Sequence, residues 1–190
     1  MDARTLLDFL KLAERLKCNT RHSYTSSGRH ESVAEHSWRL ALMAFFLRDE
    51  FPRADMDKVL RMCLIHDLGE CFTGDIPSFS KTPADEAREE RLLHEWVDAL
   101  PAPYAAEMHT LYREMAALET EEAKIYKALD KLEAVIQHNE SDLSTWTENE
   151  YSLNLTYAQG NVAFSPYLTA LRQAIRRETE EKIDREKKIK

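Results

Sequence analysis

The sequence predicts an all-α protein folded as a single helical domain. Apolar residues recur at the three- and four-residue spacing of a helix along nearly the whole chain. Glycine and proline are scarce, at 4 and 6 of 190 residues, too few for the many turns of a β architecture. Hydrophobic residues make up 43% of the chain, which is enough for a folded domain with a substantial core. No internal repeat or low-complexity linker marks a domain boundary.

The N-terminal part is expected to form an amphipathic helix followed by a long loop. The apolar stripe of this helix consists of Leu6, Phe9, Leu10, Ala13 and Leu16. The polar stretch NTRHSYTSSGRHES then interrupts the helical pattern and predicts a loop of more than ten residues. Loops of that length inside compact domains are often functional, so this segment is a candidate part of the site.

Two helices are expected next. One is predicted over about residues 33–48, with Ser32 as its N-cap and Glu35 at the capping-box position. Another is predicted over about residues 56–69, and ECFTGDIPSFSKTP after it is expected to be a loop because Gly74 and Pro77 interrupt a helix.

The remaining helices are expected in the second half of the chain. Charged amphipathic helices are predicted over about residues 84–99 and 103–118, and another over about 120–139. A last helix is expected to begin near Ser165 and Pro166, because proline is favoured at the first helical position. Its end, RRETEEKIDREKKIK, is expected to be a solvated helical tail.

Charge and cysteine content exclude several functional classes. A formal net charge of -8 argues against a broad basic surface for a nucleic-acid polymer, although a local basic pocket for a small phosphate is compatible with it. Cys18, Cys63 and Cys71 match neither a zinc-ligand pair nor a disulfide framework, which favours a reducing setting. The N-terminus resembles neither a signal peptide nor a membrane span. We therefore expect a cytoplasmic protein with no membrane partner.

Polar side chains lie on the apolar stripe of the helix predicted over residues 56–69. His66 follows Val59 and Met62 at helical spacing, Asp67 stands beside it, and Glu70 lies one turn later. Burying an imidazole and a carboxylate is unfavourable unless they are paired or bind a metal ion.

Two other predicted helices also direct an ionisable residue inward. His36 lies on the stripe of one helix, and Asp130 lies at the edge of the stripe of another. A single histidine of this kind is more often a hydrogen-bonded core residue, and a single inward aspartate is usually a cap or an ion-pair partner. The coincidence of His36, Asp130 and the adjacent His66 and Asp67 instead favours one site with nitrogen and oxygen ligands. Such a site suits Mn, Fe, Co or Zn and suits Mg less well.

The pattern of these residues resembles the HD-domain metal-dependent phosphohydrolase superfamily. The stretches ESVAEHS, LIHDLGECFTGDIPS and KALDKLEA are similar to the bacterial 5′-deoxynucleotidases of the YfbR type and their eukaryotic HD-domain relatives, over roughly residues 5–140. The resemblance implies one HD domain over residues 1–190, whose motif core spans about 5–140 and whose helical extension spans about 141–190. It also implies one divalent metal ion (Mn, Co, Fe, Zn or Mg), a small nucleotide substrate and a homodimer.

The resemblance also assigns roles to single residues. The positions that match the metal ligands are His36, His66, Asp67 and Asp130. Glu70 matches an acidic residue thought to place or activate the attacking water. Asp75 matches a residue implicated in substrate contact and catalysis, and Ser78 stands close behind it as a substrate-binding candidate. Arg21, fifteen residues before the first histidine, matches an arginine that orients the substrate phosphate. A guanidinium suits that role because it grips phosphate through two hydrogen bonds.

His22 departs from the family pattern. In the bacterial 5′-deoxynucleotidase a tryptophan follows the arginine, and this aromatic group helps to exclude the ribose 2′-hydroxyl. An imidazole is smaller and can donate a hydrogen bond, so His22 is expected to contact the substrate while the choice between deoxyribose and ribose stays open. Tyr24 is a candidate for the missing packing group.

The activity that the resemblance implies is hydrolysis of the 5′-phosphate of (deoxy)nucleoside monophosphates to nucleoside and phosphate. Within the same superfamily, a dNTP triphosphohydrolase or a hydrolase of another phosphate ester remains the alternative. A non-catalytic nucleotide-binding protein is less favoured, because the ligand set and its acidic neighbours are intact. Four other histidines show no partner pattern and are expected in surface or structural roles: His30, His94, His109 and His138.

Overall fold

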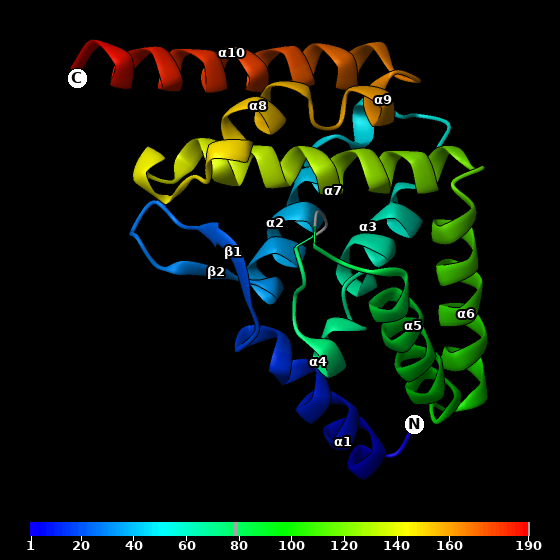
Figure 1. Ribbon diagram of the computed structural model, residues 1–190. Coiled ribbons are helices and arrows are strands. Elements are labelled where there is room, and N and C mark those ends of the chain that lie inside the picture. The colour runs from blue at the N-terminus through cyan, green and yellow to red at the C-terminus, as the bar shows by residue number, and fades with distance from the viewer. Residues whose placement is uncertain (78–79, 190) are drawn as a thin grey trace.

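A long central helix organises the protein in this computed structural model, which describes residues 1–77 and 80–189. This helix is α7 (Glu121–Glu140). The helices α2 (Val33–Phe46) and α3 (Met56–Ile65) pack on one side of it, and α10 (Pro166–Ile189) packs along the other (Figure 1). The described part of the chain is mostly helical, as the sequence predicts.

The other helices surround this central layer. The helices α5 (Pro83–Asp98) and α6 (Ala102–Ala117) pack against each other, and α6 also contacts α3 and α7 (Figure 1). Both lie within a residue or so of their predicted positions. The first helix, α1 (Ala3–Ala13), continues into a 3-10 turn over Glu14–Lys17.

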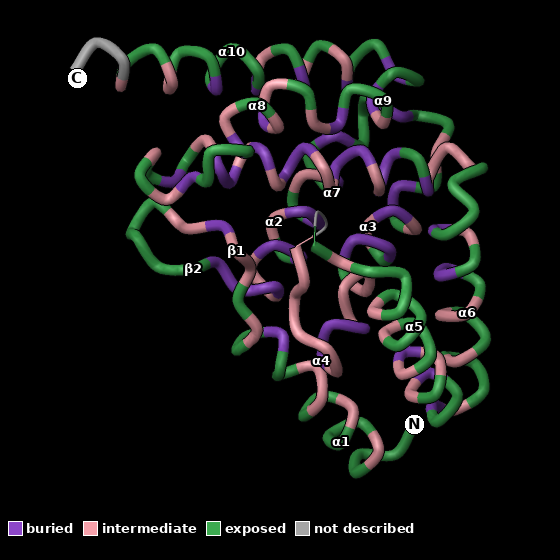
Figure 2. Tube along the Cα trace, viewed as in Figure 1, coloured by how far each residue is buried: buried purple, intermediate pink, exposed green. Residues whose placement is uncertain are grey.

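The first helix is less buried than its apolar stripe predicts. Leu16 is buried and Phe9 packs edge-to-face on Trp96, with 5.2 Å between the ring centroids. Leu6 and Leu10 are exposed, because α1 lies at the margin of the molecule (Figure 2).

The prediction of a long loop after the first helix is wrong. The segment forms an antiparallel hairpin of β1 (Thr20–Tyr24) and β2 (His30–Ser32), with Gly28 at a φ of 83° in the turn. Tertiary contacts hold the first strand, because Gln137 on α7 donates a 2.6 Å hydrogen bond to the Tyr24 carbonyl. The polar side chains of the hairpin therefore face an interior network of other polar groups, which hides the strand pattern in the sequence.

The helix predicted over residues 56–69 ends earlier, at Ile65. His66 Nδ1 donates to the Cys63 carbonyl at 2.9 Å, and the Tyr112 hydroxyl donates to the Ile65 carbonyl at 2.7 Å. These side chains thus bind the Cys63 and Ile65 carbonyls, which the backbone amides of a longer helix would need as hydrogen-bond acceptors. Residues 66–69 continue as tight turns, and the short helix α4 (Glu70–Thr73) follows.

The segment between α7 and α10 adds two short helices that were not predicted. These are α8 (Glu148–Thr156) and α9 (Gln159–Val162). At the start of the segment, Trp146 donates a 3.0 Å hydrogen bond to the His138 carbonyl. Arg172 on α10 donates a 2.6 Å hydrogen bond to the Tyr157 carbonyl. These contacts fix α8 beside the C-terminal half of α7.

The core lies where α2, α3 and α7 meet, and buried residues concentrate on these helices (Figure 2). Among its fully buried side chains are Leu40, Val59, Met62, Leu129 and Leu132. None of the described helices combines the length and the apolar character needed to cross a bilayer.

Candidate metal centre and active site

Four predicted ligands converge where α2, the end of α3 and α7 meet. His36 Nε2 lies 3.3 Å from both His66 Nε2 and Asp130 Oδ1, and 3.9 Å from Asp67 Oδ2. His66 Nε2 lies 2.9 Å from Asp67 Oδ2 and 3.8 Å from Asp130 Oδ1. The structure thus brings together all four side chains that the sequence singled out as ligands.

The donor atoms of this site fit a divalent ion. His36 Nδ1 contacts the Glu133 carboxylate and His66 Nδ1 donates to the Cys63 carbonyl, so each ring can present the lone pair of Nε2 to the site. Bonds of about 2.1 Å place neighbouring ligands of an octahedral or tetrahedral ion roughly 3.0 to 3.5 Å apart. Most separations in the site lie near that range.

The charge of the site also favours a bound cation. Burial and the Arg21 charge lower the pKa of His36, but Glu133 and Asp130 outweigh them and raise it to about 10. Burial raises the pKa of Asp67, whereas the two imidazoles lower it, with a net result of about 2. The group therefore attracts either a proton or a metal ion to His36 Nε2.

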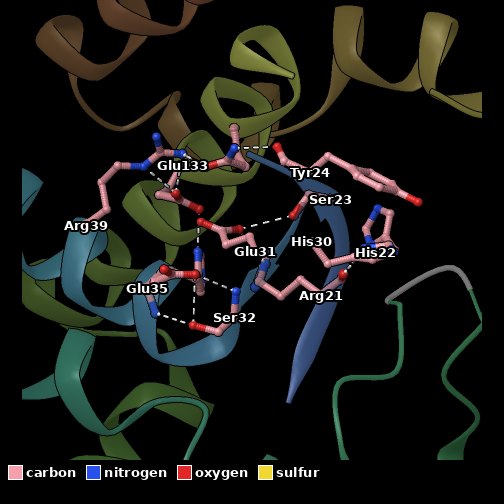
Figure 3. A network of polar contacts seen from close by, with 12 residues as sticks. Arg21, His22, Ser23, Tyr24, His30, Glu31, Ser32, Glu35, Arg39 and Glu133 are labelled. Carbon is pink, nitrogen blue, oxygen red and sulfur yellow. Dashed lines mark hydrogen bonds and ion pairs between the residues drawn. The ribbon is translucent and has the colours of Figure 1, made fainter. Parts of the chain in front are cut away.

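Glu133 contacts Nδ1 of His36, the ring nitrogen that faces away from the other ligands. Sequence reasoning did not single out this residue. Its side chain is fully buried, and Arg39 Nε donates to Glu133 Oε1 at 2.7 Å while Arg39 also donates to Gln137 at 2.6 Å. Figure 3 shows Glu133 and Glu31 at the centre of this network, with Arg39 on one side and Ser23 on the other. The position of Glu133, one helical turn after Asp130, was the signal available in the sequence.

Arg21 lies on β1 close to the ligands. Its Nε is 3.2 Å from Glu31 Oε2 and one of its terminal nitrogens is 4.0 Å from Asp67 Oδ2. Burial lowers the pKa of Arg21, but Glu133, Asp67 and Glu31 raise it further, so the guanidinium is firmly cationic. The hairpin thereby places the positive charge of Arg21 at the edge of an acidic site.

Glu70 and Asp75 are acidic groups of the site outside the ligand set. Glu70 is 6% exposed, and its Oε2 has no hydrogen-bond partner in the described part of the chain. Burial, followed by the charges of Asp67 and Asp75, raises the pKa of Glu70 to about 10. Burial is also the main reason that the pKa of Asp75 is raised. The Glu70 carboxyl group can therefore hold a proton near neutral pH.

One cavity joins these groups. Its volume is about 350 Å³, which lies within the range of about 300 to 1,000 Å³ typical of small-molecule sites. The predicted site residues along its wall are Arg21, His22, Asp67, Glu70, Asp75 and Asp130. Lys127 also lines it and donates to Asp130 Oδ2 at 2.8 Å. Ser78 lies outside the described residues.

His138 and Glu150 also line the cavity, and sequence reasoning gave neither a role there. Both are buried, and Glu150 contacts both His138 and His22. A signal for His138 exists in the sequence, because Asp130, Ala134 and His138 follow one another at four-residue spacing on one helix. No local pattern marks Glu150, which tertiary packing of α8 brings to the site.

Comparisons with known proteins find a matching family model and several related chains. The family model described as HD domain matches residues 13–172. The human protein 5′-deoxynucleotidase HDDC2 is 36% identical over 142 residues, which cover 73% of this chain and 69% of the human one. The Saccharomyces cerevisiae protein 5′-deoxynucleotidase YBR242W is 31% identical over 145 residues, 70% of this chain and 58% of the yeast one.

A solved structure shares the fold over nearly its full length. It is described as a predicted metal-dependent phosphohydrolase from Magnetospirillum magnetotacticum MS-1. It superposes with a TM-score of 0.77 at 29% identity, and the match covers 93% of this chain and 92% of that one.

Proposed function

The chain belongs to the HD domain family, and from this premise we propose that it hydrolyses the 5′-phosphate of (deoxy)nucleoside monophosphates in a metal-dependent reaction. The observation that carries the proposal is the convergence of two imidazoles and two carboxylates beside a cavity that also holds a guanidinium. The relatives named 5′-deoxynucleotidase support the choice of substrate.

His36, His66, Asp67 and Asp130 would hold one divalent ion, with Mn, Co, Fe, Zn or Mg as candidates. Such an ion supplies Lewis-acid polarisation of the phosphate and an acidified water, and its charge lowers the pKa of nearby carboxyl groups.

Arg21 is proposed to bind the phosphate. Its guanidinium reaches within 4.0 Å of Asp67, so a phosphate in contact with Arg21 lies next to the ligand set. The cationic group then neutralises charge on the phosphate oxygens as the ester is cleaved. A planar guanidinium also fixes the orientation of the phosphate through paired hydrogen bonds.

Glu70 or Asp75 is proposed to take the proton of the attacking water. The unpartnered Glu70 Oε2 is available for this hydrogen bond. The oxygen of water bonds to phosphorus, the bond from phosphorus to the 5′-oxygen breaks, and the leaving oxygen receives a proton. The products are a nucleoside and inorganic phosphate. Asp75 and Ser78 are also proposed to contact the substrate.

His22 is proposed to lie on the sugar side of the substrate. It follows Arg21 on β1 and lines the same cavity, so a phosphate held by Arg21 places the nucleoside within its range. An imidazole leaves more room than an indole, and we therefore expect activity on ribonucleotides as well as deoxyribonucleotides.

A nucleotide panel tests the proposal. Purified protein is assayed for phosphate release from dNMPs and NMPs with Mn²⁺ or Co²⁺. We expect phosphate from monophosphates and its loss in Asp67→Ala, whereas Asp49→Ala, whose side chain is 92% exposed, serves as the matched control. Release of tripolyphosphate from dNTPs without cleavage of monophosphates would instead support a triphosphohydrolase. Full activity in Asp67→Ala would contradict the metal site.

We also propose a homodimer, as the resemblance to HD-domain enzymes implies. The test is sedimentation equilibrium over a range of protein concentrations. A mass equal to that of one chain at micromolar concentration would contradict the proposal.

A further inference from the structure

A second group of metal-ligating side chains lines the cavity outside the four ligands described above. His22 on β1, His138 on α7 and Glu150 on α8 bring three ligand atoms to within 4.8 Å of one another. His22 Nε2 lies 3.0 Å from Glu150 Oε1, and His138 Nε2 lies 3.5 Å from the same oxygen. Three separate elements therefore direct their ligand atoms to one point.

The Glu150 carboxylate is held in place at the start of α8. Its Oε2 accepts a 2.6 Å hydrogen bond from the Thr147 amide in a capping box. The residue is only 2% exposed, and its Oε1 forms no well-aligned hydrogen bond with a described residue. The cap thus fixes one oxygen and leaves the other directed at the two imidazoles.

The protonation states of the group suit metal binding. Burial is the main reason that the pKa of His138 falls to about 4, so its ring is neutral at pH 7. Burial raises the pKa of Glu150, but the contacts with His22 and the Thr147 amide outweigh it and lower the pKa to about 2. A neutral imidazole and an ionised carboxylate are the forms that bind a metal ion.

The spacing of the atoms also fits a small transition-metal ion. Bonds of about 2.0 to 2.2 Å place neighbouring ligands of a tetrahedral zinc ion roughly 3.3 to 3.6 Å apart. The distances of 3.0 and 3.5 Å to Glu150 Oε1 lie close to that range. Two histidines and one glutamate are a ligand set that zinc uses in sites with an open fourth position.

We propose that His22, His138 and Glu150 form a second divalent-metal site, suited to Zn²⁺ or a similar transition-metal ion. Because the three residues line the cavity, the fourth position is open to water or to an oxygen or nitrogen atom of a bound nucleotide. His22 then acts as a metal ligand and contacts the substrate through the ion. The inference concerns metal binding alone, so it stands apart from the proposed hydrolysis.

Stoichiometry of metal binding tests the second site. Full-length protein freed of metal by chelator is titrated with Zn²⁺ alone, and bound metal is counted by elemental analysis after desalting. We expect two ions per chain in the wild type, one in His138→Ala, one in Asp67→Ala and none in the double variant. The matched control is His109→Ala, a half-buried residue of α6 outside both groups of ligands, which should keep two ions.

Cobalt spectroscopy identifies which site is lost. Tetrahedral Co²⁺ absorbs visible light much more strongly than octahedral Co²⁺. In Asp67→Ala, which lacks the four-ligand centre, an intense band should persist, and it should disappear when His138→Ala is added to that variant. Adding His22→Ala instead should also abolish the band, and this change leaves the Glu150 cap of α8 intact. One ion per chain in the wild type, or two in His138→Ala, would overturn the proposal.

Discussion

Glu133 determines how His36 presents itself to the candidate metal centre. The carboxylate contacts Nδ1 of the ring, which directs the lone pair of Nε2 toward the other ligands. Arg39 in turn holds Glu133 through its Nε, at 2.7 Å. A buried ion pair thus fixes the tautomer and the orientation of one ligand.

We expect Glu133→Gln to weaken Mn²⁺ binding by about 10- to 100-fold, because an amide holds the His36 tautomer less firmly than a carboxylate does. Calorimetric titration of metal-free protein measures the change. Circular dichroism checks that the variant is folded. An unchanged Mn²⁺ affinity in a folded variant would show that Glu133 does not position the ligand.

Glu70→Gln tests the proposed proton acceptor. The amide cannot take a proton, so we expect kcat to fall by about 10²- to 10⁴-fold. Bound Mn²⁺ should stay at the wild-type level, because Glu70 lies outside the ligand set. Phosphate release and metal analysis on the same sample separate the two effects. Retention of wild-type kcat would exclude Glu70 as the acceptor and leave Asp75.

The end of α3 shows how a single element shapes the site. Neighbouring residues of a continuous helix point about 100° apart, so His66 and Asp67 would diverge if the helix ran on to residue 69. The helix ends at Ile65, and the tight turns after it let both side chains reach His36. The early helix end is therefore part of the ligand geometry.

The start of α2 gives a prediction about stability and pH. The Glu35 carboxylate accepts hydrogen bonds from Arg29 at 2.6 Å and from the Ser32 amide at 2.8 Å. The hydrogen bond from Arg29 is the main cause that lowers the pKa of Glu35 from 4.5 to about 2. This carboxyl group therefore contributes stability that is fully present above pH 4.5 and is lost as the pH falls toward 2.

We expect Glu35→Gln to lower the free energy of unfolding at pH 6 by about 0.5 to 1 kcal/mol, because the capping box and an exposed ion pair are weakened. The difference from the wild type should shrink between pH 4.5 and pH 3. Urea unfolding at several pH values measures it, with Asp49→Asn as the exposed control. A difference that stays constant with pH would contradict the assigned pKa.

At the scale of the whole molecule, the candidate metal centre joins segments that are distant in the sequence. Its candidate ligands come from α2, from the turn after α3 and from α7, and these helices also form the core. A bound ion therefore links the elements whose packing defines the fold. Binding to the folded state alone raises the free energy of unfolding in proportion to the logarithm of the ion concentration.

Removal of metal should accordingly lower the melting temperature. At a free Mn²⁺ concentration of about 100 times Kd, the ion adds about 2.7 kcal/mol, which corresponds to roughly 5 to 10 °C for a chain of this size. Scanning calorimetry with Mn²⁺ or with chelator measures the shift. The double variant with Asp67→Ala and His138→Ala, which lacks both proposed sites, should melt at the same temperature in both conditions, and a persistent shift there would place the Mn²⁺ elsewhere.

The sequence by itself determined the helical class, the approximate positions of most helices and the four candidate ligands. Helical periodicity is local, so an inward histidine or aspartate such as His36 or Asp130 is visible from its neighbours along the chain. The capping box at Ser32 and Glu35 was also predicted and is present, because its contacts span only three residues.

The tertiary structure decided the hairpin, the early end of α3 and the contacts around the ligands. Gln137 stabilises β1 from α7, Tyr112 caps α3 from α6, and α8 delivers Glu150 to the cavity. Each of these contacts joins residues far apart in the chain, and a hydrogen bond or an ion pair of that kind leaves no local pattern. Helical periodicity therefore predicts the four candidate ligands, whereas long-range packing creates the contacts around them.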